Sequence, residues 1–387
     1  PDDIRDQVEL YRHSDVKKLI WAVNYGESTN YPTQVPGAHF LGASGTRADL
    51  IPPGGGSNEY VRGQRALRDT LSDFAKQGTS VPEIAAEHSR EIGIEFDLMI
   101  RLGILGEVSP LTFRPEDNYV RRFPQFRQVM RDGSVAEKAS YAFPEVRKLM
   151  LDIIEESARL TDADGVNLCF VRGPHFIRYE QPVLDRFREL HGEDAREVPE
   201  DDPRLQAVRA EFMTTFLRDA RGVLDRVGEG KGKRLNLSIW VWPHDRKVWL
   251  GGVPMDDGLD VKGWIEAGLL DSVICQEGVD RSYIDLGAKH GCEFVLFTGY
   301  HGELAMSPAT VTAAYGNGVD QFAYWDADCF ITSVNFWQWA RRIGHREEMA
   351  DWERLSQLNR ASTLVKLVKI NGTDVENHLA TSVYSGG

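Results

Sequence analysis

The sequence predicts an α/β protein built as a (β/α)8 barrel of the TIM type. Short apolar runs alternate with amphipathic segments along most of the 387 residues. Nearly continuous apolar runs are typical of parallel strands that are buried on both faces, and their alternation with helices indicates parallel βαβ units. An open doubly wound sheet would give the same alternation, but it usually carries a glycine-rich phosphate loop after its first strand, and no such loop follows the first run here.

Seven strands can be counted in this way. The first reads KKLIWAVNYG, and the others lie at 94–103, 164–173, 234–243, 271–278, 292–300 and 319–328. A complete barrel needs an eighth strand. We expect that strand to be irregular within the first 60 residues, or to have been truncated upstream of the sequence.

The segments between these strands have helical patterns. In 143–160 the apolar residues recur at helical spacing, and in 80–93 Pro82 stands in the first turn, where its missing N–H leaves no hydrogen bond unmade. Further helices are expected at 201–228, 260–270, 282–291 and 307–318. The glycine-rich stretch PPGGGSNEY (52–60) follows no strand and is interpreted as a flexible loop.

We expect one barrel domain, residues 1–350, and a short C-terminal extension, residues 351–387, packed on it. Within the extension, STLVKLVKINGT (362–373) is interpreted as a closing strand or a small appended hairpin.

The net charge of −14 argues against nucleic acids and anionic membranes as partners. No run of about 18 apolar residues predicts a membrane span. The four cysteines form no CxxC pair and lie beside apolar runs, so they are predicted to be buried thiols. The chain begins without Met or a signal peptide. It is therefore expected to be secreted or periplasmic if an upstream signal was removed, and cytoplasmic otherwise.

The active site of such a barrel lies at the carboxyl ends of the strands. Aromatic, amide, basic and acidic side chains gather at those positions. Sugars require this mixture, because aromatic faces bind C–H surfaces and polar forks bind hydroxyls. The residues predicted to bind substrate are Asn24, Tyr25, Arg101, Arg172, His175, Trp242, His244, Asp245, Gln276, Tyr300, His301 and Trp325.

Cleavage of a glycosidic bond needs two carboxylates, and Glu180, Glu277 and Asp326 are the candidates. Glu180 is predicted to be the general acid, because the apolar residues of its loop would raise its pKa. Asp326 or Glu277 would act as nucleophile or base. The alternative for each carboxylate is a solvated position or a helix cap.

Three segments carry a resemblance: YAFPEVRKLMLDIIEES, DGVNLCFVRGPHFIRYEQPVLDRFRE and GLDVKGWIEAGLLDSVI. Over residues 80–330 the chain resembles the glycoside-hydrolase-like TIM barrels often labelled family-10-like glycosyl hydrolases. The resemblance implies a barrel acting on a polysaccharide or oligosaccharide. In many such proteins the second segment reads DGI-x-LD, with an acid where this chain has Cys169, and Glu180, Glu277 and Asp326 then become the replacement candidates.

The leading hypothesis is therefore a glycoside hydrolase with a carbohydrate substrate and no cofactor. Arg101 and Arg172 make an acidic sugar, such as a uronate or a sulfated unit, worth testing. A barrel that binds sugars without cleaving them is an alternative, motivated by Cys169. A metal-dependent hydrolase using His175, His244 and His301 is another, although no HxH or HExxH spacing supports a metal.

Overall fold

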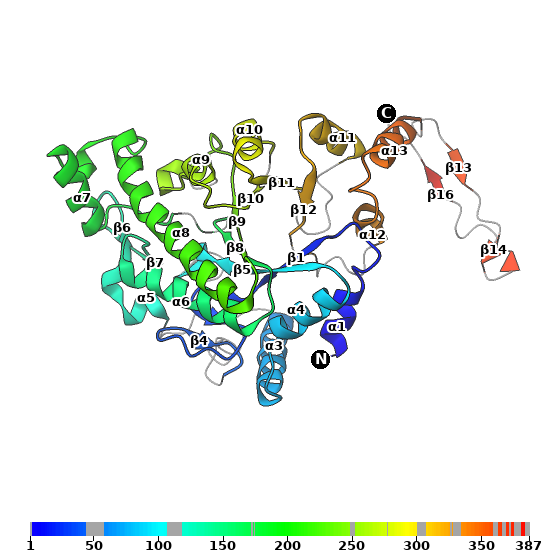
Figure 1. Cartoon of the computed structure of the whole chain (residues 1–387), viewed down its shortest axis with the longest axis horizontal. Helices are drawn as coiled ribbons and strands as arrows, with labels where there is room; N and C mark the ends of the chain where they lie inside the picture. The colour runs from blue at the N-terminus through cyan, green and yellow to red at the C-terminus, as the bar shows by residue number, and fades with distance from the viewer. Residues whose placement is uncertain are drawn as a thin grey trace.

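A computed structural model gives the fold (Figure 1). It describes residues 2–43, 58–106, 118–171, 173, 175–247, 252–276, 278–299, 307–325, 327 and 334–358, together with four short strands beyond them. Its centre is one parallel sheet with the strand order β1-β5-β8-β9-β10-β11-β12. The strands are β1 (Lys18–Ala22), β5 (Glu95–Arg101), β8 (Gly165–Cys169), β9 (Asn236–Val241), β10 (Ser272–Cys275), β11 (Glu293–Phe297) and β12 (Gln321–Ala323). All seven predicted strands are confirmed.

The sheet is buried on both faces, as the continuous apolar runs predict. Side chains such as Leu98, Leu168 and Ile239 point outward into the main core under the helices. Their neighbours Met99 and Cys169 point the other way, into a second apolar cluster inside the sheet. Alternation of side chains along each strand produces these two clusters.

The sheet is strongly curled. Arg101 ends β5, the second strand in the order, and its guanidinium lies 5.7 Å from the ring of Trp325, which follows the last strand, β12. In a flat sheet, strands five positions apart would be separated by about 24 Å. The fold is therefore a TIM-like half-barrel of seven strands. No ladder between β12 and β1 closes it among the described residues.

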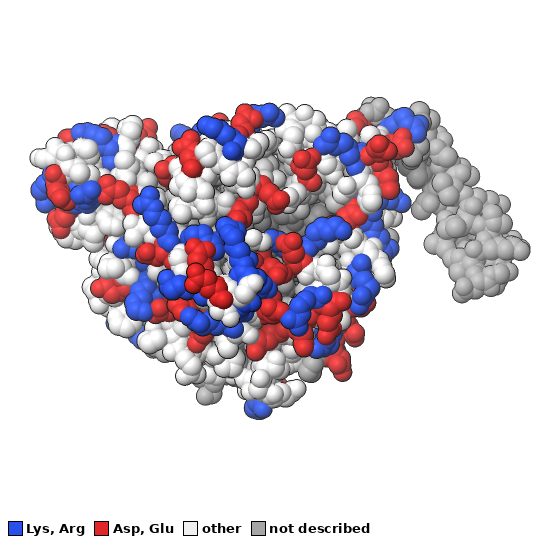
Figure 2. Space-filling model, viewed as in Figure 1, with Lys and Arg blue, Asp and Glu red and all other residues white. Residues whose placement is uncertain are grey.

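Helices cover the outer face of the sheet in the order that the sequence predicts (Figure 1). Several begin at a proline in the first turn, where the missing N–H leaves no bond unmade. The covering helices are α4 (Val81–Glu91), α6 (Pro144–Leu160), α8 (Pro203–Lys231), α9 (Val261–Glu266), α10 (Arg281–His290) and α11 (Pro308–Gly316). A further helix, α7 (Gln181–His191), was not predicted from the sequence and packs against α8. Their outer faces carry interspersed acidic and basic side chains (Figure 2).

Several elements were not predicted from the sequence. Residues 24–40 form a separate three-stranded sheet and do not supply the eighth barrel strand in the described part of the chain. The stretch 52–60 was interpreted as a loop, but its last three residues already belong to α3, and 52–57 lie outside the described residues. The unpredicted elements are α1 (Asp2–Glu9), β2 (Asn24–Tyr25), β3 (Ser28–Thr29), β4 (His39–Phe40), α3 (Asn58–Lys76), α5 (Tyr119–Arg122), β6 (Arg127–Val129), β7 (Val135–Ala139), α12 (Val334–Ala340) and α13 (Arg346–Leu358).

The C-terminal part contains two short antiparallel pairs. β13 (Thr363–Val365) pairs with β16 (Thr381–Val383), and β14 (Lys369–Ile370) pairs with β15 (Thr373–Asp374). The hairpin interpretation of the tail fits these pairings. The division into a barrel, 1–350, and an extension, 351–387, stays a prediction. No described helix is long and apolar enough to cross a membrane.

The cysteines that the structure describes are buried thiols, as predicted. Cys169, Cys275 and Cys292 lie in the core, and no disulfide joins them. Burial raises the pKa of the Cys275 thiol well above its ordinary value, which disfavours the reactive thiolate. Cys329 lies outside the described residues.

Candidate functional site at the carboxyl edge of the sheet

An arginine stacked on aromatic rings stands at the carboxyl end of β5. The guanidinium of Arg101 lies 4.6 Å from the ring centre of Tyr25 and 5.7 Å from that of Trp325. Asn24 fixes the backbone below it, because its Oδ1 accepts the N–H of Arg101 at 2.8 Å and its amide donates to the carbonyl of Gly26. The structure therefore brings four predicted site residues together, with Asn24 in a positioning role.

The aromatic group continues across the inside of the sheet. Trp240 lies edge-on to Trp325, with ring centres 4.7 Å apart, and 5.6 Å from Phe297. Its indole N–H donates to Oε1 of Gln276 at 2.8 Å, which orients that amide. Trp242, two residues further along the chain, belongs to the same buried cluster. Two more predicted residues, Gln276 and Trp242, thus lie in this group, together with Trp240, which was not among the predicted site residues.

Cys169 lies between the arginine and the tryptophan in the ladder. The register pairs Arg101 with Cys169, and Cys169 with Trp240. Side chains at paired positions of parallel strands stand side by side on the same face, about 4.8 Å apart. A neutral thiol therefore occupies the place beside Arg101 where the resembling barrels often carry an acid.

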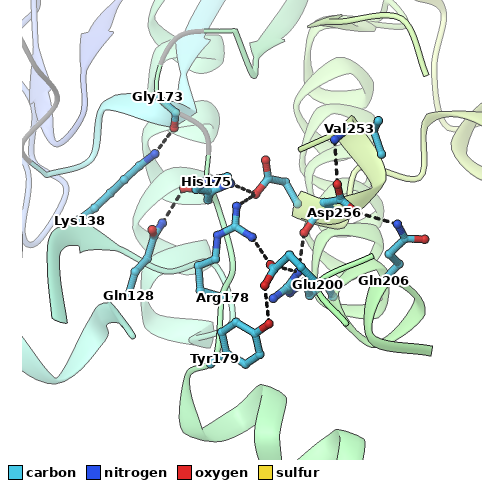
Figure 3. Close-up of polar contacts among 12 residues, drawn as sticks. Gln128, Lys138, Gly173, His175, Arg178, Tyr179, Glu200, Gln206, Val253 and Asp256 are labelled. Atoms are coloured by element: carbon cyan, nitrogen blue, oxygen red, sulfur yellow. Dashed lines mark hydrogen bonds and ion pairs between the residues drawn. The ribbon is translucent and has the colours of Figure 1, made fainter. Parts of the chain in front are cut away.

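The loop after β8 is held by contacts from the β6–β7 hairpin. The ammonium of Lys138 donates to the carbonyl of Gly173, and the amide of Gln128 donates to that of His175 at 2.6 Å (Figure 3). Gly173 has φ +82°, and a Cβ there would clash with the carbonyl oxygen of Gly103. Glycine is required at this turn because it crosses directly over the end of β5.

Below this loop lies a charged network that sequence reasoning missed. Asp257 accepts from Nδ1 of His175 at 2.8 Å and from Arg178 at 3.2 Å. Arg178 also donates to Glu200 at 2.5 Å, and the hydroxyl of Tyr179 donates to the same carboxylate (Figure 3). Burial raises the pKa of Asp257. The network connects the loop to Glu200, 22 residues from Arg178 in the sequence, and to Asp257, about 80 residues away. Contacts between residues so far apart cannot be predicted from the local sequence.

Glu180 is enclosed in protein and bonded to backbone groups. Its side chain is fully buried, and its two oxygens accept the N–H of Val129 at 3.1 Å and that of Arg178 at 2.8 Å. Burial raises the pKa of Glu180, against the backbone hydrogen bonds that lower it. The raised pKa agrees with the prediction, but the bonds also give this carboxylate a structural role between the hairpin and α7.

His244 and Asp245 follow β9. Nδ1 and the backbone N–H of His244 both donate to Asp280, at 2.8 and 2.7 Å. Asp280 also caps α10 by accepting from Ser282 and Tyr283. Burial alone would raise the pKa of Asp280, but its bonds with Ser282 and His244 hold that pKa below the ordinary value. Asp245 is exposed.

Five predicted residues lie outside the described part of the chain: Arg172, Glu277, Tyr300, His301 and Asp326. Among the residues that are described, no group of three or more His, Cys, Asp or Glu side chains could hold a metal ion. His175 and His244 bind separate carboxylates, Asp257 and Asp280.

A pocket of about 340 Å³ opens elsewhere, between α6 and α8 on the outer layer. It is lined by charged side chains such as Lys148, Asp152 and Arg218, and Lys148 pairs with Asp152 at 2.6 Å. Solvated pairs of this kind are ordinary on helix surfaces. The pocket lies among the helices and not where the strands end.

Comparisons with known proteins found similar solved structures. No family model and no curated protein sequence matches this chain. Among solved structures, the glycoside hydrolase domain of PgaB (BpsB) from Bordetella bronchiseptica is similar, with a TM-score of 0.54 and 10% identity, covering 88% of this chain and 92% of that one. The catalytic domain of β-amylase from Paenibacillus polymyxa matches with a TM-score of 0.48 and 9% identity, covering 86% and 94%.

A longer protein also matches: α-L-fucosidase isoenzyme 2 from Paenibacillus thiaminolyticus, with a TM-score of 0.49 and 12% identity, covering 94% of this chain and 47% of that one. At 10% identity, the match to the PgaB domain shows a fold like that of this glycoside hydrolase domain. Membership of the family-10-like group stays a prediction.

Proposed function

We propose that this chain is a glycoside hydrolase that cleaves a polysaccharide or oligosaccharide with a pair of carboxylates. The observation that carries the proposal is the set of aromatic rings, a guanidinium and an amide at the carboxyl edge of a barrel-like sheet. Such rings bind the C–H faces of sugars, and the polar groups bind hydroxyls. The likeness of fold to the PgaB glycoside hydrolase domain supports the same class.

The carboxylate pair is drawn from the three candidates of the sequence. Glu277 directly follows Gln276, and Asp326 directly follows Trp325, so each is adjacent in sequence to a residue of the aromatic group. We favour these two as the acid and the nucleophile or base. One protonates the glycosidic oxygen, while the other attacks the anomeric carbon or activates water. Glu180 is the third candidate, and its backbone bonds favour a structural role.

The test is a reducing-end assay of the purified chain on a panel of polysaccharides. Glu277→Gln and Asp326→Asn should each lower kcat by roughly 10²- to 10⁴-fold, as is usual for a lost acid or base. Glu266→Gln, at an exposed position at the end of α9, is the matched control and should retain activity. Wild-type activity in both Glu277→Gln and Asp326→Asn would contradict the assignment of this pair.

A barrel that binds sugars without cleaving them is the second candidate. It is favoured by one observation, the neutral Cys169 beside Arg101 in the ladder. Binding of an oligosaccharide with no product after prolonged incubation would support it over the hydrolase. A metal-dependent hydrolase has less support, because His175 and His244 are bonded to different carboxylates. Full activity of a metal-free preparation would remove it.

A further inference from the structure

Arg101 is a buried cation without a partner in the described structure. Only 9% of the residue is exposed, and its Nε is buried with no hydrogen-bond partner. Its two Nη atoms form no hydrogen bond or ion pair with a described residue either. Other buried arginines of the chain are paired: Arg178 with Asp257 and Glu200, and Arg209 with Glu200.

An unpaired charge that is largely buried is unfavourable, because fewer water molecules solvate it. The cation–π contacts with Tyr25 and Trp325 offset part of this cost. The rings offer no hydrogen-bond acceptor in their planes, so the contacts with them leave the Nε of Arg101 without a partner. A guanidinium edge presents parallel donors that fit the two oxygens of a carboxylate or sulfate.

The described positions around this edge are neutral. In the ladder, Arg101 stands beside Cys169, and beyond it come Trp240 and then Ile274. Gln276 offers an amide and no charge. None of these described residues can neutralise the guanidinium.

We infer that Arg101 binds the carboxylate or sulfate of an acidic sugar, so that the substrate of the proposed hydrolase is an anionic poly- or oligosaccharide. The claim that this sugar is a substrate rests on the proposed function. The claim that Arg101 binds it does not. The stacked rings hold the guanidinium in one orientation before the ligand arrives, which reduces the entropy lost on binding. The sugar ring would lie on the neighbouring aromatic side chains.

The experiment measures binding to a panel of paired glycans. Each uronate oligosaccharide is tested with its neutral methyl ester, and each sulfated oligosaccharide with its desulfated form. Binding is followed by calorimetry and by the fluorescence of the buried tryptophans. We expect at least one acidic member to bind about tenfold or more tightly than its neutral counterpart, and the uronate and sulfate arms identify which oxyanion is preferred.

Three variants assign the preference to this residue. Arg101→Gln should remove it, and Arg101→Lys should keep part of it, because lysine retains the charge but loses the fork and the stacking. Arg218→Gln, at an exposed position in the groove between α6 and α8, should bind like the wild type. If Arg101→Gln does not fold, the lysine variant and the wild-type panel still decide the question.

Two results would overturn the inference: no acidic glycan binds the wild type better than its neutral form, or the preference survives in Arg101→Gln. The first is also expected if Arg101 serves only to pack the rings. The proposed function fails separately. Hydrolysis of a neutral glycan without anion preference would leave the hydrolase and remove the inference. Preferential binding of an acidic glycan that is never cleaved would leave the inference and remove the hydrolase.

Discussion

Asp97 gives the protein a stability that depends on pH. It lies in β5 with no exposed surface, two positions before Met99 on the face that lines the inside of the sheet. Lys18 is the cation beside it, with Nζ 3.0 Å from Oδ2. Burial raises the pKa of Asp97 to about 6 from 3.8, with Lys18 acting in the opposite direction. Burial also lowers the pKa of Lys18, but Asp97 and Glu95 more than offset this, so the lysine stays protonated.

The direction of the effect follows from linkage. Since the pKa is higher in the folded state, the folded chain holds this proton more tightly than the unfolded chain between pH 4 and pH 6. The contribution to the free energy of unfolding is therefore complete below about pH 4 and is lost as the pH rises through 6. A rise of about two pKa units corresponds to about 3 kcal/mol.

Asp97→Asn removes this dependence. In this variant Lys18 is still paired with a carboxylate, because Glu95 lies 3.2 Å from its Nζ. In urea unfolding at pH 4, 5, 6 and 7.5, the stability of the variant minus that of the wild type should increase with pH, by up to about 3 kcal/mol. Asp73→Asn, on the exposed end of α3, is the control and should show a constant difference. A difference that is constant or shrinks as the pH rises would refute the reasoning, because the ion pair would then outweigh burial.

Three further changes test other parts of the structure. Glu180→Gln should lower the free energy of unfolding by about 2 kcal/mol in urea, because one of two backbone N–H groups loses its acceptor; lost activity at unchanged stability would instead support a general acid. Gly173→Ala should cost at least about 1–2 kcal/mol from its positive φ alone, measured by calorimetry, whereas Gly230→Ala in α8, with open space around it, should not destabilise. Asp280 has a lowered pKa, so its stabilisation is present above its unfolded pKa and lost in acid; Asp280→Asn should therefore destabilise more at pH 7 than at pH 3.

The barrel strands could be predicted from the sequence because a strand that is buried on both faces is a nearly continuous apolar run. GVNLC, for example, is apolar enough to identify β8 without knowledge of its neighbours. The small sheet at 24–40 and the β6–β7 hairpin contain no such apolar run. Their strands are two to five residues long, and a pair of short strands is specified by what it packs against more than by its own residues.

The candidate site shows the same limit in its side chains. The apolar neighbours of Glu180 in the sequence correctly predicted that its pKa is raised. They could not show that its oxygens bond the N–H of Val129, about 50 residues earlier. Likewise His175 was recognised at a strand end, while its partner Asp257 belongs to a loop after the next strand. Such hydrogen-bond partners depend on how distant segments pack together. They can therefore be identified only from the three-dimensional structure.

Strand register decides the character of the carboxyl edge. Side chains alternate between the two faces, so a slip of one residue in β5 would turn Arg101 outward and replace it inside the sheet with a neighbour. The observed register places Arg101 inside, beside Cys169, and sets both next to Trp240. An acid at position 169 would neutralise the guanidinium from within the sheet. The thiol cannot, and this difference is one basis for the proposal that Arg101 binds an anionic ligand.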